Sequence, residues 1–242
     1  MIKTLKVLLI AILVVGTAYP LTVGAETSTT TVTFTPGTGS VTPVDPEAPE
    51  NPRVIDPVAT TAIDKNNPAI DNSGNTSGLT IDTVPSFPFT VKYGTFETVY
   101  TTYETPYVQV SDRSGTAEGW SLTLTTGELT RVGSTSLPYT LTLHNGAINQ
   151  AYLPDGATPT TAPTTPAGSI SAISHASTPA AVTVLEAGVN AGMGTWIKKF
   201  YGTAATEKAS IKIDTRNMSS TTHEPYTAQL TWTLAVTPEG DS

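Results

Sequence analysis

The sequence contains no cysteine, few charged residues and few aromatic residues. Without cysteine the chain has no disulfide, no thiol nucleophile and no zinc–thiolate site. Charged residues make up 13% of the 242 residues, and the 20 acidic residues outnumber the 12 basic ones. A surface of that sign repels phosphate backbones, so we expect no nucleic-acid partner. The three histidines, His144, His175 and His223, stand apart from one another, and none has the spacing of a metal ligand.

Catalytic signatures are also missing, and we predict neither an enzyme nor a cofactor or metal site. The sequence has no GxSxG elbow and no P-loop. Asp112, Glu118 and Glu128 lie near Trp120 in sequence, but they stand among turn residues, which favours solvated loop charges over a glycosidase pair. The segment from Asp71 to Gly78 lacks the glycine and glutamate of a calcium loop, which favours a simple turn.

The N-terminus is predicted to be an export signal over residues 1–25. Lys3 and Lys6 precede an apolar run from Val7 to Val15, and Val23–Ala25 has the small residues of a cleavage site. The run is shorter than the roughly 20 residues that a transmembrane helix needs. We therefore expect a secreted mature chain that begins at Glu26 and is not inserted in the membrane.

Prolines gather in the segment that follows. Proline removes a backbone donor and fixes φ, so this stretch is unsuited to a sheet or a long helix. The sequence predicts a disordered, Pro/Gly/acidic flexible spacer over residues 26–76. The prolines concerned are Pro36, Pro43, Pro46, Pro49, Pro52 and Pro57.

From Ser77 onward the pattern changes to an alternation of apolar and polar residues, which indicates half-buried antiparallel strands. The segment from Gly188 to Phe200 is instead expected to hold a short helical turn. We predict an all-β, antiparallel, β-sandwich-like single domain of roughly 8–10 strands. The expected strands centre on Leu79–Ile81, Phe87–Val91, Tyr107–Val110, Trp120–Leu124, Tyr139–Leu143, Val182–Val184, Ile211–Ile213 and Tyr226–Val236.

One short pattern occurs twice in this alternation: Trp120-Ser121-Leu122 and Trp232-Thr233-Leu234. Residues two apart on a strand face the same way, so each pattern puts an indole and a leucine side by side. The alternation favours a core role for these four side chains. A recognition role stays open, because exposed aromatic rings bind carbohydrates and proteins. The aromatic candidates for such a role are Trp120, Trp196, Trp232, Tyr100, Tyr103, Tyr201 and Tyr226.

Three blocks in a fixed order resemble the WxL-domain cell-surface proteins of Gram-positive bacteria (Firmicutes). They are "SGLTIDTVPSFPF" from Ser77, "VQVSDRSGTAEGWSLTL" from Val108 and "YTAQLTWTLAVTP" from Tyr226. The signal, the acidic proline-rich spacer and the lack of cysteine agree with that family. The resemblance assigns residues 77–242 to a WxL domain and makes Trp120, Leu122, Trp232 and Leu234 its motif positions.

The resemblance implies a non-enzymatic protein at the cell surface or in the cell wall, attached non-covalently to peptidoglycan. It also implies partners: a membrane-anchored WxL-interacting protein and other surface proteins, with which such chains assemble. Two alternatives remain open. The chain is held at the surface indirectly, by the WxL-interacting protein, or it is a secreted adhesin or glycan hydrolase.

Overall fold

The computed structural model describes residues 35, 37, 41–51, 77–101, 105–131, 136–153, 158–165, 170–173, 180–202, 204, 208–216 and 225–236. The expected signal peptide and most of the expected spacer lie outside these ranges. Within them there is no helix, and eleven strands form three antiparallel sheets. The prediction of an all-β, sandwich-like fold is confirmed.

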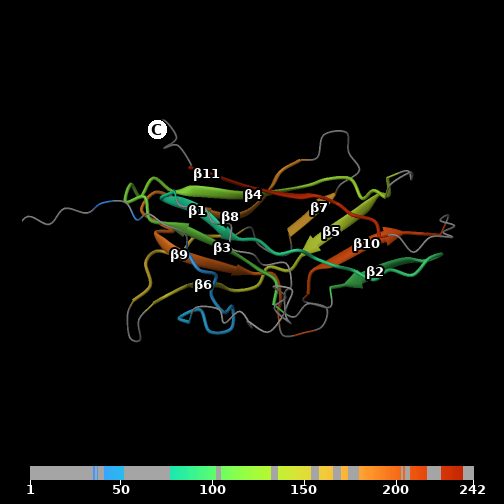
Figure 1. Ribbon diagram of the computed structural model, residues 1–242, viewed down its shortest axis with the longest axis horizontal. Coiled ribbons are helices and arrows are strands. Elements are labelled where there is room, and N and C mark those ends of the chain that lie inside the picture. Colours follow the sequence, from blue (N-terminus) through green and yellow to red (C-terminus); the bar gives the residue numbers. More distant parts are fainter. Residues whose placement is uncertain are drawn as a thin grey trace, which may run out of the picture. The chain divides into compact units, whose positions relative to one another are not determined.

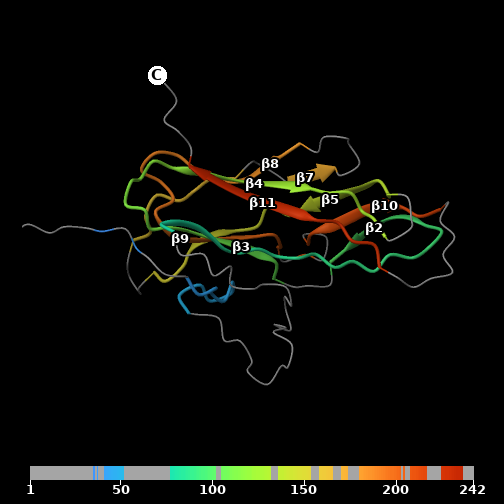
Figure 2. The same cartoon turned by 45° about the horizontal axis from the view of Figure 1, so that its top comes forward.

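The first sheet has the order β1-β3-β9-β6. Val108 and Val110 of its central strand β3 face the main core, whereas Tyr107, Gln109 and Ser111 alternate with them on the outer face and are also buried. Figure 2 shows β3 and β9 on the opposite side of the fold from β4 and β8. The strands are β1 (Leu79–Thr83), β3 (Tyr107–Asp112), β9 (Gly194–Lys199) and β6 (Ile148–Gln150).

The second sheet has the order β2-β10-β5-β7, and the third has the order β11-β4-β8. Strand β7 contacts both β4 and β8, so these two sheets adjoin (Figure 1). The second sheet holds β2 (Phe96–Tyr100), β10 (Ser210–Asp214), β5 (Tyr139–Leu143) and β7 (Ile170–Ile173). The third holds β11 (Leu230–Val236), β4 (Trp120–Thr126) and β8 (Val182–Ala187).

One hydrophobic core lies between the sheets. All three contribute fully buried side chains to it, for example Val110 of β3, Leu124 of β4 and Ile213 of β10. Burying such a side chain contributes roughly 1.5–3 kcal/mol, so the core accounts for most of the favourable free energy of folding. All described strands belong to one compact unit, Phe34–Ser242.

Two local predictions are wrong. The alternating stretch Phe87–Val91 forms no strand, because Pro85 and Pro88 flank or interrupt it and supply no backbone donor. The segment predicted to hold a helical turn instead forms β9, which pairs with both β3 and β6. Its Thr, Trp and Ile suit a pleated, buried surface, and this sheet context outweighs the nearby glycines.

Residues 41–51, within the expected spacer, pack on the outer face of the first sheet; we call this segment the strap. Pro43, Val44 and Pro46 are buried there, and Val44 contacts Tyr107 and Ile197. Prolines prevent this segment from forming a regular strand, but they do not prevent it from packing on the sheet. The side chain of Gln109 in β3 forms hydrogen bonds with the strap backbone. The amide of Val44 donates to Gln109 Oε1 over 2.9 Å.

Candidate functional site

The two Trp-x-Leu motifs lie on neighbouring antiparallel strands. Strand β4 carries the first and β11 carries the second, and Leu122 stands directly opposite Leu234. Trp120 is paired with Val236, and Trp232 with Leu124. The four motif side chains therefore share one face of one sheet and pack toward the core; the two strands run side by side in Figure 1.

The first motif is entirely enclosed. Trp120 and Leu122 each have 0% exposure, because β4 is the central strand between β11 and β8. The indole Nε1 donates a 3.2 Å hydrogen bond to the carbonyl of Gly192. Gly192 has φ of +69°, and a Cβ there would lie 2.8 Å from that nitrogen. A left-handed glycine turn thus closes over the ring, and Trp120 touches no solvent.

The second motif is half-buried, because β11 is an edge strand with β4 as its one strand neighbour among the described residues. The Trp232 ring packs on Phe200, with centroids 5.9 Å apart. Phe200 in turn meets Phe87 edge-on at 6.1 Å. This aromatic row joins β11 to the proline-interrupted segment Val84–Val91 across the core.

An apolar groove of about 840 Å³ begins at Trp232; we call it the open groove. It is lined on one side by Val84–Val91 and on the other by Pro225–Ala228, Leu230 and Trp232. Its floor is the inner face of β5 and β10. The groove exists because Val84–Val91 replaces a paired strand there, so the layer opposite β5 and β10 is incomplete.

The mouth of the open groove carries little charge. The guanidinium of Arg131 lies 4.9 Å from the centre of the Tyr226 ring, a cation–π distance. Among the described residues that line the groove there is no aspartate and no glutamate. Such a groove binds apolar side chains or chain segments and has no carboxylate for acid–base chemistry.

The opposite face of the same sheet exposes aromatic rings. Phe96 and Tyr100 of β2 point outward with exposures of 54% and 39%, whereas the exposed Tyr93 in the preceding turn lines the open groove. Lys212 and Arg216 lie 5.1 and 5.2 Å from the centre of the Phe96 ring. We call the rings of Phe96 and Tyr100 and these two cations the β2 face. Rings beside cations stack on sugar rings and attract carboxylates.

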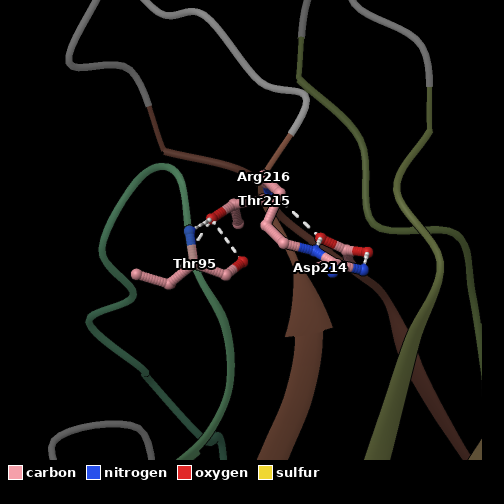
Figure 3. Close-up of polar contacts among 4 residues, drawn as sticks. All are labelled: Thr95, Asp214, Thr215 and Arg216. Carbon is pink, nitrogen blue, oxygen red and sulfur yellow. Dashed lines mark hydrogen bonds and ion pairs between the residues drawn. The ribbon is translucent and has the colours of Figure 1, made fainter.

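Polar contacts at the end of β10 hold the β2 face in place. Figure 3 shows Thr215 bridging to Thr95: its Oγ1 accepts from the Thr95 amide over 3.0 Å. The guanidinium of Arg216 donates two hydrogen bonds, of 3.0 and 2.7 Å, to the carboxylate of Asp214. These bonds hold the pKa of Asp214 down at about 2, so the pair stays ionised at neutral pH.

A buried carboxylate lies beneath the strap. Asp82 accepts hydrogen bonds from Thr80 and Ser111, each over 2.6 Å, and from Gln109 over 3.0 Å. Burial raises the pKa of Asp82, against the opposing effect of these donors. Because Gln109 also holds the strap through Val44, the network ties β1 and β3 to residues 41–51. Its role in the described structure is to fix the strap.

The other candidates from the sequence fall into separate places. Trp196 is buried, with its Nε1 donating to Met193, and Tyr201 is half-buried, with its hydroxyl donating to Glu47. Tyr103, His175, His223 and most of Asp71–Gly78 lie outside the described residues. Asp112 is buried at a turn and accepts from Ser114.

Sequence reasoning missed Phe96, Tyr93 and the strap. The alternation Phe96-Glu97-Thr98-Val99-Tyr100 was the available signal for an outward aromatic pair. Within the described residues no three histidine or acidic side chains come together as a cation site. No helix of the described ranges is long and apolar enough to cross a membrane.

Comparison with known proteins gives one match. A family model described as "WxL domain surface cell wall-binding" matches residues 22–238, which is nearly the whole chain. The matched range contains both motifs, the open groove, the β2 face and the strap. No curated protein and no solved structure matches the chain.

Proposed function

The chain belongs to the WxL family of surface cell wall-binding domains, and on that premise we propose that it is exported and attaches non-covalently to peptidoglycan. The observation that carries the proposal is the match over residues 22–238, in which both Trp-x-Leu motifs lie on paired strands of one domain. Residues 1–25 act as the export signal, and the mature chain resides on a Gram-positive surface.

The β2 face is the surface that we assign to the wall. Trp120 and Leu122 are enclosed, so the first motif has no surface to offer a glycan. Phe96 and Tyr100 are two of the large apolar side chains that are exposed in the described structure. Lys212 supplies positive charge beside them on an otherwise acidic chain, which suits the carboxylates of the wall polymer, whereas the charge of Arg216 is paired with Asp214.

Sedimentation with purified cell walls tests the assignment. The mature chain is mixed with walls before and after removal of teichoic acids, and the pellet is quantified. We expect sedimentation with both, and at least a tenfold loss for the double variant Phe96→Ala, Tyr100→Ala. Val189→Ala, which removes an equally exposed apolar side chain from the β8–β9 turn, is the matched control and should bind within twofold of the parent.

Two outcomes would change the proposal. If the parent chain stays in the supernatant with both wall preparations, wall binding is wrong. If the double variant sediments as well as the parent, wall binding stands and the β2 face is the wrong surface. Circular dichroism of each variant separates loss of binding from loss of fold.

A second role is assembly with protein partners at the surface, and a specific observation favours it. The open groove is lined mainly by apolar side chains, and among the described strands the far edge of β11 has no partner, which suits a protein segment. In this alternative the WxL-interacting protein retains the chain at the surface. Deleting that partner in the host should then release the chain into the medium.

We propose no catalytic activity. The family is described as wall-binding, and the open groove is lined by apolar side chains. Incubating the pure mature chain with muropeptides or host glycans should leave them intact by mass spectrometry, and any turnover would overturn this part of the proposal.

A further inference from the structure

Strand β11 has one edge that pairs with β4 and one edge that faces away from it. Thr227 exchanges two backbone hydrogen bonds with Thr130, of 2.8 and 2.9 Å, and Gln229 accepts from Gly127. Odd-numbered residues therefore direct their backbone groups toward β4. Because backbone direction alternates along a strand, the even-numbered residues from Tyr226 to Leu234 direct theirs to the other side.

Among the described residues, no backbone–backbone hydrogen bond outside the strand ladders engages those even-numbered residues, and β4 is the one described strand that pairs with β11. The same residues place their side chains along the open groove: Tyr226, Ala228, Leu230 and Trp232 line it. A free backbone edge and an apolar groove thus run side by side over the same residues.

The facing wall offers no competing strand. Val84–Val91 makes no backbone–backbone hydrogen bond within the described residues, although the hydroxyl of Thr101 approaches the Pro88 carbonyl at 3.4 Å. Two prolines prevent this segment from closing the gap as a ladder. The space between Val84–Val91 and β11 therefore stays open, at about 840 Å³.

Edge strands in proteins usually carry a charge, a proline or a bulge that prevents pairing with another chain. Strand β11 has the sequence Leu-Thr-Trp-Thr-Leu-Ala-Val, which contains neither a charged residue nor a proline. Its exposed threonines favour a strand and do not repel a neighbour. An uncharged edge beside an apolar groove matches the receptor side of strand addition, in which main-chain bonds bind the partner and pockets select alternate side chains.

We propose that the free edge of β11, together with the open groove, binds an extended segment of a partner protein as an added antiparallel or parallel strand. The segment has apolar residues at alternate positions, which enter the groove beside Leu230 and Trp232. It has no proline at its centre, because its amides bond to the carbonyls of the even-numbered residues of β11. This surface is the site of the second role proposed above and does not depend on wall binding.

A random 12-residue peptide library displayed on phage, selected on the full mature chain, tests the proposal. We expect enriched peptides with apolar residues at every second position and without a central proline. Enrichment of proline-rich peptides, or of none, overturns it.

Hydrogen exchange then distinguishes strand addition from side-chain contact alone. Adding a synthetic copy of the enriched peptide should slow exchange at the amides of Ala228, Leu230 and Trp232 at least tenfold. The amide of Thr227 already bonds to Thr130 and that of Thr231 faces β4, so both should change little. If the even-numbered amides gain no protection, the peptide does not bind as a strand and the proposal fails.

Three variants complete the test. Ala228→Pro removes one backbone donor from the free edge without removing a hydrogen bond to β4, and Ala228→Lys puts a charge into the groove. Each variant should bind the peptide at least tenfold more weakly than the parent. Gln229→Lys adds the same charge one residue away, on the exposed face, and should bind within twofold of the parent. If Ala228→Lys and Gln229→Lys bind the peptide equally well, the proposal is overturned. This comparison remains decisive even if Ala228→Pro does not fold.

Two other occupants are outcomes of the same measurement. If the even-numbered amides of the chain alone gain protection as its concentration rises, the occupant is a second copy. If muropeptides protect them and peptides do not, the occupant is a glycan. Either result overturns the proposal, whereas failure of the parent chain to sediment with walls leaves it standing.

Discussion

The two Trp-x-Leu motifs have nearly the same sequence, lie on the same sheet face and stand opposite one another, yet their surroundings differ. Trp120 lies on a central strand and has no exposure, with a hydrogen bond from its indole to Gly192. Trp232 lies on an edge strand, is half-buried, and lines a groove. The difference comes from the position of the strand in the sheet and not from the motif.

This comparison separates two roles that a shared motif obscures. The first motif is closed on all sides, so its contribution is to the stability of the core. The second contributes to the core through Phe200 and also presents an indole and a free backbone edge to the open groove. The core is incomplete where β11 faces the unpaired segment Val84–Val91, and it is this part of the molecule that carries the open groove.

The largest expected difference is in stability after truncation of each tryptophan. Trp120→Ala should cost about 3–5 kcal/mol, because it empties a closed site. Trp232→Ala should cost less, roughly 2–3 kcal/mol, since the partly exposed ring loses less transfer free energy and leaves a site open to solvent. Urea unfolding of both variants measures the two costs. Equal costs would show that the motifs are energetically equivalent and would break the comparison.

The next largest effect is expected at the turn that closes over Trp120. Gly192→Ala puts a Cβ at φ of +69°, 2.5 Å from the Cβ of Ala187 and 2.8 Å from the indole nitrogen. Strain of this kind costs on the order of 1–3 kcal/mol. The urea midpoint should fall accordingly. In contrast, Gly115→Ala, at φ of +76° with open space around it, keeps the backbone strain without the clash and should cost less.

Strand alternation predicted the sheet face of both motifs but not the order of the strands. Parity along Trp120–Leu124 and Leu230–Leu234 is local, whereas the neighbours of β11 depend on pairings more than 100 residues apart in sequence. The same limit explains why β9 was not predicted. It forms a strand because it pairs with β3 and β6, and the local sequence of β9 does not indicate these partners. The strap was missed because proline predicts the absence of ladder bonds, not the absence of packing.

The groove shows a further limit of sequence reasoning. The apolar residues of Phe87–Val91 alternate as those of a strand do, and Pro88 breaks that strand without removing its apolar side chains from the core. The groove forms because Val84–Val91 does not pair with a neighbouring strand. The hydrophobic periodicity of a segment does not indicate whether a neighbouring strand will pair with it. The β2 face was recoverable in principle, since Phe96 and Tyr100 share one parity with Thr98 between them.

A smaller effect is expected from the contact between the motifs. Leu122 and Leu234 are directly opposite, so a double-mutant cycle with alanine at both positions should give a coupling free energy of about 0.5–1 kcal/mol. The single changes should differ, at about 2–5 kcal/mol for Leu122 and less for the half-buried Leu234. A coupling of zero would mean that the two motifs do not act on one another, although they are neighbours.

The smallest effect is optical and involves no change in stability. Of the three tryptophans, Trp120 and Trp196 are buried at 0% and 2% exposure, so acrylamide should quench mainly the emission of Trp232. Trp232→Phe should therefore abolish most of the quenchable fluorescence, whereas Trp196→Phe should leave it in place. A peptide bound at the edge of β11 should shield Trp232 from acrylamide in the parent chain, because it would cover the groove where that ring lies. Quenching that persists in Trp232→Phe would mean that the first motif is open to solvent, and the distinction between a closed and an open motif would be lost.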